Sequence, residues 1–367
     1  SVYTVYRFLD ELNSKLKPEI EQITFEATKK LLRGHIGVVF YDMTTLYFEA
    51  SDEDDYRIAG FSKDGKHQQP QIMIGLLVSN HGYPLGYQIF EGNTSETKTL
   101  IPVLEAFRDK FNIAKPVIVA DAALLSEKNI HALQEHSYEY ILGARLKNES
   151  EDIKQKVRDL EIEADQPREL KNKYGRLIVS YSAKRAHNDR KNREKGLKRL
   201  KKKFKSGKLT KEHINNRGYN KYLTLSGEVN ISIDFNKFEA DSAWDGLKGY
   251  VTNTRLSRKN VIGNYSQLWQ VEKAFRISKT DLRIRPIFHR LKNRIEAHIC
   301  ICFTAYAIYK ELERLLKKNN VGLSAEKAIE QIKEIRQLSY TLPKSRKIKT
   351  KILKPTEIQA RLLNLKI

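Results

Sequence analysis

The chain has 367 residues, of which 40% are hydrophobic and 31% are charged. That balance is typical of a globular protein of two or three domains and excludes a disordered or membrane-embedded one, since even the longest apolar stretch, about Ala297–Tyr309, is too short to span a bilayer. The net charge of +22 instead indicates a polyanionic partner, most simply a nucleic acid.

The first part of the chain is expected to begin with helices and to continue as a sheet. Residues 1–34 carry apolar positions at helical spacing. A strand is predicted at Gly37–Asp42, followed by a turn and more extended chain. Gln71–Ser79 is a continuous apolar run, as in a strand buried on both faces, and Tyr83–Phe90 returns as its hairpin partner.

Helices and strands alternate after this hairpin. A helix is expected to be capped at position 94 or 95 and to run to about Phe111. Pro116–Asp121 is predicted to be a short buried strand, Ser126–Glu135 a helix, and Tyr138–Ala144 a fifth strand. This order predicts an α/β fold in which a mixed five-stranded sheet has helices on its faces.

From Leu146 to about Asn260 the regular alternation of strands and helices is interrupted by charged, helix-like sequence and short β segments. This change indicates an insertion, whose β segments are RLIVSYS, NKYLTLS and KGYVTNT. Residues 184–211 hold fourteen Lys or Arg against two acidic residues and so supply +12 of the net charge. Phosphate contacts would explain this run, because each neutralised phosphate releases a counterion. The alternative is a solvated, partly disordered loop. The candidate nucleic-acid contacts are Arg190, Lys191, Lys201, Lys202 and Lys203, although the charge does not indicate which kind of nucleic acid.

Helical periodicity returns at about Val261 and continues to the end, apart from a basic, proline-marked loop around Leu342–Pro355. Cys300 and Cys302 are the only cysteines, and they fit core packing better than a metal site. The N-terminus also lacks a signal-peptide pattern, so a reduced, cytoplasmic location is expected. The predicted divisions are a helical N-terminal segment, the first part of a sheet domain, an insertion, helices that complete the sheet domain, and a helical C-terminal region: 1–34, 35–145, 146–260, 261–310 and 311–367.

Two aspartates follow apolar strands in this prediction. Asp42 and Asp121 each lie at the C-terminal end of a strand, where ligand sites form in open α/β sheets. Either residue alone is more often a turn former. Neighbouring parallel strands would bring both carboxylates to one sheet edge, where their oxygens suit a divalent cation.

A third carboxylate, Glu272, lies in the segment NYSQLWQVEKAFRISKTDL. Tyr265, Glu272 and Lys279 are spaced seven residues apart. Seven residues are nearly two helical turns, with a drift of about 20° per step, so we expect all three on one helix face. The alternative is a solvated stripe on an amphipathic helix.

Together these segments resemble the DDE transposases of bacterial insertion sequences, in the branch marked by a Tyr-x2-Arg-x3-Glu-x6-Lys signature. Tyr265, Glu272 and Lys279 match that spacing, but the Arg position holds Leu268, and Arg276 is a candidate to replace it. YDMTTLYFE and VIVADAALLS are similar to the segments around the two aspartates of the family. The resemblance covers about residues 35–310.

The resemblance implies a ribonuclease H-like fold and an enzyme that cleaves DNA and transfers strands at transposon ends. It implies that Asp42, Asp121 and Glu272 bind two Mg²⁺ ions, with Mn²⁺ able to replace them. The expected partner is double-stranded DNA, as terminal inverted repeats and as target, with no membrane involved. A homodimer assembled on DNA in a bacterial cytoplasm, near the nucleoid, is expected.

Further roles are expected around Glu272. Tyr265 and Lys279 would flank the scissile phosphate, and Trp269 or Trp244 would stack on an unpaired base, with core packing as the alternative for each tryptophan. Other functions remain open: a nuclease of the same fold without strand transfer, an inactive relative that only binds DNA, and an RNA-binding protein. Glu96 fits the first turn of a helix better than a ligand site.

Overall fold

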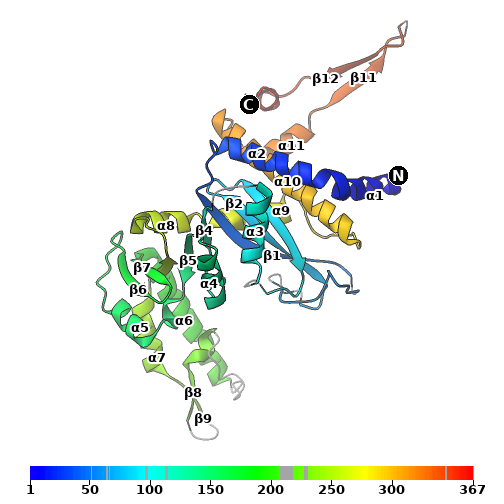
Figure 1. Cartoon of the computed structure of the whole chain (residues 1–367). Helices are drawn as coiled ribbons and strands as arrows, with labels where there is room; N and C mark the ends of the chain where they lie inside the picture. The colour runs from blue at the N-terminus through cyan, green and yellow to red at the C-terminus, as the bar shows by residue number, and fades with distance from the viewer. Residues whose placement is uncertain are drawn as a thin grey trace. The chain divides into compact units, whose positions relative to one another are not determined.

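The computed structural model describes residues 1–50, 52–62, 65, 67–95, 98–111, 115–206, 218–226, 230–343 and 345–366, so Glu96 lies outside the described residues. The chain forms two compact units (Figure 1). The first unit combines Ser1–Pro116 with Gln267–Ile367, and the second is Val117–Ser266. The chain therefore passes between the units at two points, after Pro116 and after Ser266.

The first unit contains an antiparallel sheet with the order β3-β2-β1, formed by β1 (Val38–Tyr47), β2 (Gln71–Ser79) and β3 (Pro84–Glu91). All nine residues of β2 are buried, as its continuous apolar sequence predicts. β1 is longer than predicted, and Asp42 lies in its middle, opposite Leu76, rather than at its end. The β-branched and aromatic residues that follow Asp42 favour continued pairing over a turn.

The two faces of β1 contact different helices. Just before α3 (Leu100–Phe111), the Thr99 hydroxyl accepts a hydrogen bond from the Tyr41 hydroxyl at 2.8 Å and donates to the Met43 sulfur at 2.7 Å. Side chains alternate along a strand, so Asp42, Thr44 and Leu46 share the opposite face. On that face pack α9 (Trp269–Thr280) and α10 (Lys292–Lys318).

The N-terminal segment is helical, as predicted. It consists of α1 (Val2–Glu11), a π-helical turn (Leu12–Leu16) and α2 (Lys17–Leu31), which pack against α10 (Figure 1). Cys300 and Cys302 are both buried in the core of the unit, so their predicted packing role is confirmed. No helix among the described residues is long and apolar enough to cross a membrane.

The C-terminal region contains a β-hairpin where the sequence predicts a loop. After α11 (Ala325–Lys333), the strands β11 (Gln337–Thr341) and β12 (Ile348–Ile352) pair antiparallel, and α12 (Glu357–Leu363) follows. Ile-Lys-Thr-Lys-Ile alternates with the period of a strand, which the basic composition of the segment obscures.

The second unit contains a mixed sheet with the order β4-β5-β10-β7-β6. β4 and β5 are parallel, and the remaining pairings are antiparallel. The strands are β4 (Val117–Ala120), β5 (Tyr140–Ala144), β6 (Arg168–Asn172), β7 (Gly175–Tyr181) and β10 (Leu247–Thr252). All five strands predicted before residue 145 form, but the segment predicted as an insertion adds β10, β7 and β6 beside β5.

The second unit also contains helices and a small hairpin. The helix predicted at Ser126–Glu135 forms as α4, and the Ser126 side chain caps it. The basic run is a helix, α6, as far as Lys205, so the loop interpretation is wrong for these residues. The helices are α4 (Glu127–Glu135), α5 (Glu151–Arg158), α6 (Ala183–Lys205), α7 (Phe235–Ala240) and α8 (Arg258–Ser266), with the hairpin strands β8 (Leu223–Ser226) and β9 (Asn230–Ile233) and 3₁₀ turns at Leu146–Asn148, Gly218–Tyr222 and Asp241–Trp244.

Candidate active site and nucleic-acid interface

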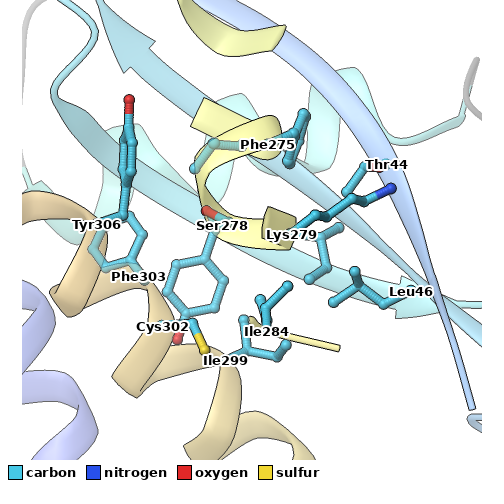
Figure 2. A pocket seen from close by; sticks show the side chains of 13 residues that line it. Thr44, Leu46, Phe275, Ser278, Lys279, Ile284, Ile299, Cys302, Phe303 and Tyr306 are labelled. Carbon is cyan, nitrogen blue, oxygen red and sulfur yellow. The ribbon is translucent and has the colours of Figure 1, made fainter. Parts of the chain in front are cut away.

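Asp42 lies on the face of β1 against which α9 packs. The Lys279 side chain of α9 lines an apolar pocket together with Thr44 and Leu46 of β1. Figure 2 shows this lysine running from α9 towards Thr44, beside the aliphatic side chains of the pocket. Because Asp42 is one alternation before Thr44 on the same face, the first unit presents Asp42 towards the side of the sheet that carries α9.

Glu272 lies on α9 two turns before Lys279. The helix is anchored by Val271, Ala274 and Ile277, which are buried, while the Glu272 side chain is exposed. Within the described part of the chain its carboxylate makes no hydrogen bond or ion pair, which leaves its oxygens accessible to a ligand. The first unit thus carries two of the three predicted carboxylates on elements that pack together.

Asp121 belongs to the second unit, directly after β4. Its Oδ1 accepts a hydrogen bond from the backbone N–H of Ala123 at 2.7 Å, and this local turn holds the carboxylate at the strand end. The predicted strand-end position is therefore confirmed for Asp121 but not for Asp42. In neither unit, over the residues described, do three or more His, Cys, Asp or Glu side chains gather in a metal-binding arrangement.

The helix predicted to carry Tyr265, Glu272 and Lys279 is divided. α8 ends at Ser266 and α9 begins at Trp269, so Tyr265 lies in the second unit and shares no helix face with Glu272. Between them, backbone bonds from Gln270 to Gln267 (2.9 Å) and from Val271 to Leu268 (3.2 Å) begin the new helix. The prediction of one shared face is wrong for Tyr265, although Glu272 and Lys279 remain on α9.

Leu268, in the Arg position of the family signature, is a core residue. It is only 7% exposed, and it belongs to the first unit. Arg276, the proposed replacement, is exposed on α9, and Trp269 is 48% exposed at the start of the same helix. Trp269 and Arg276 are seven residues apart and share a face, so α9 can present an aromatic and a cationic group together.

Tyr265 lies beside the sheet edge that carries Asp121. A Cβ atom added to Gly143 of β5 would lie 2.5 Å from the Tyr265 hydroxyl and 3.1 Å from the Ala122 nitrogen, so glycine is needed for this close approach. The Tyr265 ring meets Tyr250 edge-on at 5.0 Å, and the Lys248 ammonium lies 4.5 Å from its centroid. Tyr265 is only 8% exposed, so most of this phenol near Asp121 is buried.

A cavity of about 540 Å³ lies in the second unit and includes Tyr265, Ala122 and Trp244 in its lining. Six cationic and three acidic side chains also line it: Arg145, Lys147, Arg185, Arg193, Lys221 and Lys248, with Asp189, Asp241 and Asp245. This excess of cations suits a phosphate-bearing ligand. The partly exposed Trp244 adds an aromatic surface within it.

Arg145 is a candidate phosphate contact that the sequence analysis missed. It directly follows β5, the parallel neighbour of β4, so it lies at the same sheet edge as Asp121. The residue is exposed, and among the described residues its guanidinium has no hydrogen-bond or ion-pair partner. The sequence does show a cation directly after the predicted strand Tyr138–Ala144. Its importance becomes clear only from the parallel pairing of β4 and β5, which places it at the same sheet edge as Asp121.

Ion pairs hold several of the charged side chains that line this cavity. Asp241 accepts from Lys147 at 2.8 Å and also from Lys221 and Tyr222, while Arg193 pairs with Asp245. Burial by itself would raise the pKa of Asp241, but the hydrogen bonds from Lys147, Lys221 and Tyr222 outweigh it and lower the pKa to about 2. Asp241 therefore stays charged and holds two lysines in place at neutral pH.

We expect Asp241→Asn to lower the free energy of unfolding at pH 6 by about 1 kcal/mol, after allowance for solvent screening. A lowered carboxylate pKa stabilises the fold above the unfolded value of 3.8, and that contribution is lost as the pH falls through about 2. The difference between variant and wild type should therefore shrink between pH 4 and pH 2. Urea unfolding at several pH values measures it, and a difference independent of pH would contradict the assignment.

The basic helix α6 presents its cations to solvent. Its buried residues, Gly196 and Leu200, face the rest of the second unit, where Leu200 packs with Tyr222 and Phe238. Arg193 is fixed by Asp245. The five candidate DNA contacts are all exposed: Arg190, Lys191, Lys201, Lys202 and Lys203. A rigid helix with cations at both ends of its length is a better template for a phosphate backbone than a loop would be.

Two other polar residues, Glu296 and His298 of α10, have partners within the core. Glu296 accepts from the Lys17 ammonium at 3.3 Å, and the Nε2 of His298 lies 2.9 Å from the backbone oxygen of Ile284. Burial lowers the pKa of His298, which therefore stays neutral at physiological pH. The pair is accounted for by packing of α10.

The sequence matches the family described as "Transposase DDE domain" over residues 33–308. The match covers most of the chain and shows that the protein belongs to this family of transposases. Membership confirms the resemblance recognised from the segments around Asp42, Asp121 and Glu272. A comparison with curated proteins finds no match.

A comparison with solved structures gives three partial matches of low similarity. The piggyBac transposase synaptic complex with hairpin DNA has a TM-score of 0.44 and 8% identity, over 79% of this chain and 50% of that chain. The Mos1 transposase paired-end complex with the left transposon end has a TM-score of 0.21 and 15% identity, over 35% and 42%. The catalytic domain of the Mos1 mariner transposase has a TM-score of 0.20 and 10% identity, over 34% and 58%. The protein spans about half the length of the piggyBac chain, and its family assignment rests on the sequence match.

Proposed function

We propose that the protein is a DNA transposase that cleaves transposon ends and transfers strands with Asp42, Asp121 and Glu272 as ligands of two divalent cations. The observation that carries the proposal is the packing of α9, with Glu272, on the β1 face that bears Asp42. Asp121 at the end of β4 supplies the third carboxylate. Three carboxylates form a hard oxygen donor set that fits Mg²⁺, with Mn²⁺ as a substitute.

When bound, the two cations would supply activation of a water or 3′-hydroxyl and stabilisation of the leaving oxygen in an in-line displacement at phosphorus. The protein's own groups orient the reactants. The Ala123 amide fixes the Asp121 carboxylate, and the buried side of α9 fixes Glu272. In the second unit, Arg145 adds positive charge at the sheet edge that carries Asp121, and the Tyr265 phenol lies beside the same edge. In the first unit, Lys279 adds positive charge on the helix that carries Glu272.

The DNA partner is double-stranded and is bound through its phosphates by α6 and the cationic cavity of the second unit. The exposed cations of α6 and the six cations of the cavity support this part of the proposal. Assembly as a homodimer on terminal inverted repeats, in a cytoplasmic setting, completes the proposed function. Backbone contacts of this kind carry no base information, so sequence reading would fall to other residues.

The decisive experiment incubates the protein with labelled DNA carrying the terminal inverted repeats of its element, with Mg²⁺ or with EDTA. Nicks and joined products are expected with Mg²⁺ and not with EDTA, and the gel also resolves whether a hairpin forms on the way. Cleavage without joined products would indicate a nuclease that lacks strand transfer. Binding without cleavage would indicate an inactive relative, and preferential binding of RNA would contradict the proposal.

Base stacking is assigned to Trp244 rather than Trp269, because Trp244 lines the cationic cavity. We expect Trp244→Ala to slow cleavage of intact duplex ends by about tenfold to a hundredfold, since stacking is worth about 1–3 kcal/mol per base. Ends with a mismatched or missing base near the cut should partly rescue the variant. Trp269→Ala is the matched control, and the absence of rescue for Trp244→Ala would remove the stacking role.

Lys279→Ala is expected to impair cleavage on every substrate alike, because its ammonium acts on phosphate rather than on a base. Rates are compared on intact, mismatched and gapped ends after thermal unfolding has shown that the variant is folded. Lys279→Arg, which keeps the charge, should retain more activity than Lys279→Ala. A loss confined to intact ends would assign Lys279 to base handling instead.

A further inference from the structure

Both strands of the β-hairpin in the C-terminal region are exposed. In the register of β11 and β12, Leu338 lies opposite Lys351 and Tyr340 opposite Lys349, and all ten strand residues are exposed. Figure 1 shows the hairpin extending away from α10 and α11. Two isolated strands are at best marginally stable in water. A binding partner that covers the hairpin would add the stability that the two strands lack.

The base of the hairpin is held by the surrounding helices. The Leu353 amide donates to the Arg336 carbonyl at 2.9 Å, which closes the ladder at its root. α11 and α12 pack together on either side of this root, where the Gln359 side chain donates to the Gln331 carbonyl at 3.2 Å. The root of the hairpin is therefore held by α11 and α12 of the first unit.

All the charged residues in and around the hairpin are positive. Between Ile335 and Thr356 the sequence contains seven Lys or Arg and no Asp or Glu. Opposite residues of an antiparallel pair lie on the same side, so one face of the ribbon combines Leu338 and Tyr340 with Lys349 and Lys351. Leu338 is 50% exposed, Tyr340 43% and Ile348 73%, which leaves apolar surface of the kind found at interaction sites.

The geometry points to duplex DNA as the partner of this hairpin, with the ribbon in the major groove. A two-stranded ribbon fits that groove, which is about 12 Å wide, and apolar side chains can contact thymine methyl groups while lysines reach phosphates. A second copy of the hairpin is disfavoured as the partner, because the seven cations of one copy would repel the seven cations of the other. Lysines along the strands also oppose edge-to-edge pairing. This inference rests on the proposed DNA transposase function and adds a second DNA-binding surface, on the first unit.

The test uses the full chain and a random-sequence 30-base-pair duplex in a fluorescence anisotropy titration over a range of salt. Four changes are combined in one variant: Arg346→Gln, Lys347→Gln, Lys349→Gln and Lys351→Gln. The slope of log K against log salt should fall by up to about 3.6, at about 0.9 per phosphate contact, with at least a tenfold loss of affinity at physiological salt. The matched control changes four exposed lysines of α10 and α11 to Gln: Lys317, Lys318, Lys327 and Lys333.

A second variant guards against misfolding of the first. Because Arg336 and Leu353 form a closing pair, Gln337–Ile352 can be replaced by Asn-Gly, which makes a two-residue turn. This variant should lose the same salt dependence. The major-groove ligand methyl green should compete with the wild-type hairpin for DNA, whereas the minor-groove ligand netropsin should not.

Several outcomes would overturn the inference. They are an unchanged salt slope in both hairpin variants, an equal loss in the lysine control, and competition by netropsin alone. Loss of binding to vesicles containing phosphatidylserine, with DNA binding intact, would assign the hairpin to membranes, and loss of self-association alone would assign it to a second copy. Cleavage by the wild type is measured separately with Mg²⁺, so a failure of the catalytic proposal is distinguishable from a failure of the hairpin proposal.

Discussion

Asp42→Asn, Asp121→Asn and Glu272→Gln should each reduce DNA cleavage at least about a thousandfold while leaving DNA binding nearly intact. Each change keeps the side-chain shape but removes one negative ligand, and two-cation catalysis contributes several kcal/mol of transition-state stabilisation. Loss of one ligand is enough because the cations act together on the attacking and leaving oxygens. Cleavage of end-labelled DNA and anisotropy binding of the same duplex are measured side by side.

Glu127→Gln is a suitable control for this series, because Glu127 is an acidic residue only six positions after Asp121 and lies in the first turn of α4. It should cleave DNA at the wild-type rate. A triad variant that also cleaves at that rate would remove its residue from the proposed site. Equal loss of binding and cleavage would instead indicate that the carboxylate supports the fold, which thermal unfolding would reveal.

Neutralising the exposed cations of α6 should weaken binding to all DNA sequences alike. The variant combines Arg190→Gln, Lys191→Gln, Lys201→Gln, Lys202→Gln and Lys203→Gln. If all five contact phosphates, the salt slope should fall by about 4.5, and the affinity near physiological salt should fall by several orders of magnitude. Glutamine retains the helix propensity of these positions, so α6 itself should survive.

The matched control for α6 removes the same number of charges elsewhere, by changing Lys30, Lys317, Lys318, Lys327 and Lys333 to Gln. These lysines are exposed on the helices α2, α10 and α11, all in the first unit. Binding should change little in this control. An equal reduction of the salt slope in both variants would show that DNA binding depends on the total charge of the protein and not on the cations of α6.

The parts of the fold that follow from local pattern were predictable. The unbroken apolar sequence of β2, the Asn80–Gly82 turn and the Ser126 cap each encode their structure within a few residues. The pairing of β10 with β5 was not predictable, since it joins segments about a hundred residues apart. The same limitation hid Arg145, whose place beside Asp121 depends on the parallel pairing of β4 and β5.

The break between α8 and α9 could not be predicted for a different reason. The segment Ser266–Trp269 contains no Gly or Pro, so it carries no helix-stop signal. Tertiary packing decides the outcome, because Tyr265 is buried in the second unit and Leu268 in the first. The prediction of one shared helix face from the heptad spacing is therefore confirmed for Glu272 and Lys279 and wrong for Tyr265.

The burial of Leu268 limits which residues this position accepts. An arginine here, as in the signature that this segment resembles, would place a guanidinium where the leucine is only 7% exposed, and an unpaired buried charge costs several kcal/mol. Leu268→Arg alone should therefore destabilise the first unit, and the arginine would be accommodated only together with changes in neighbouring core residues.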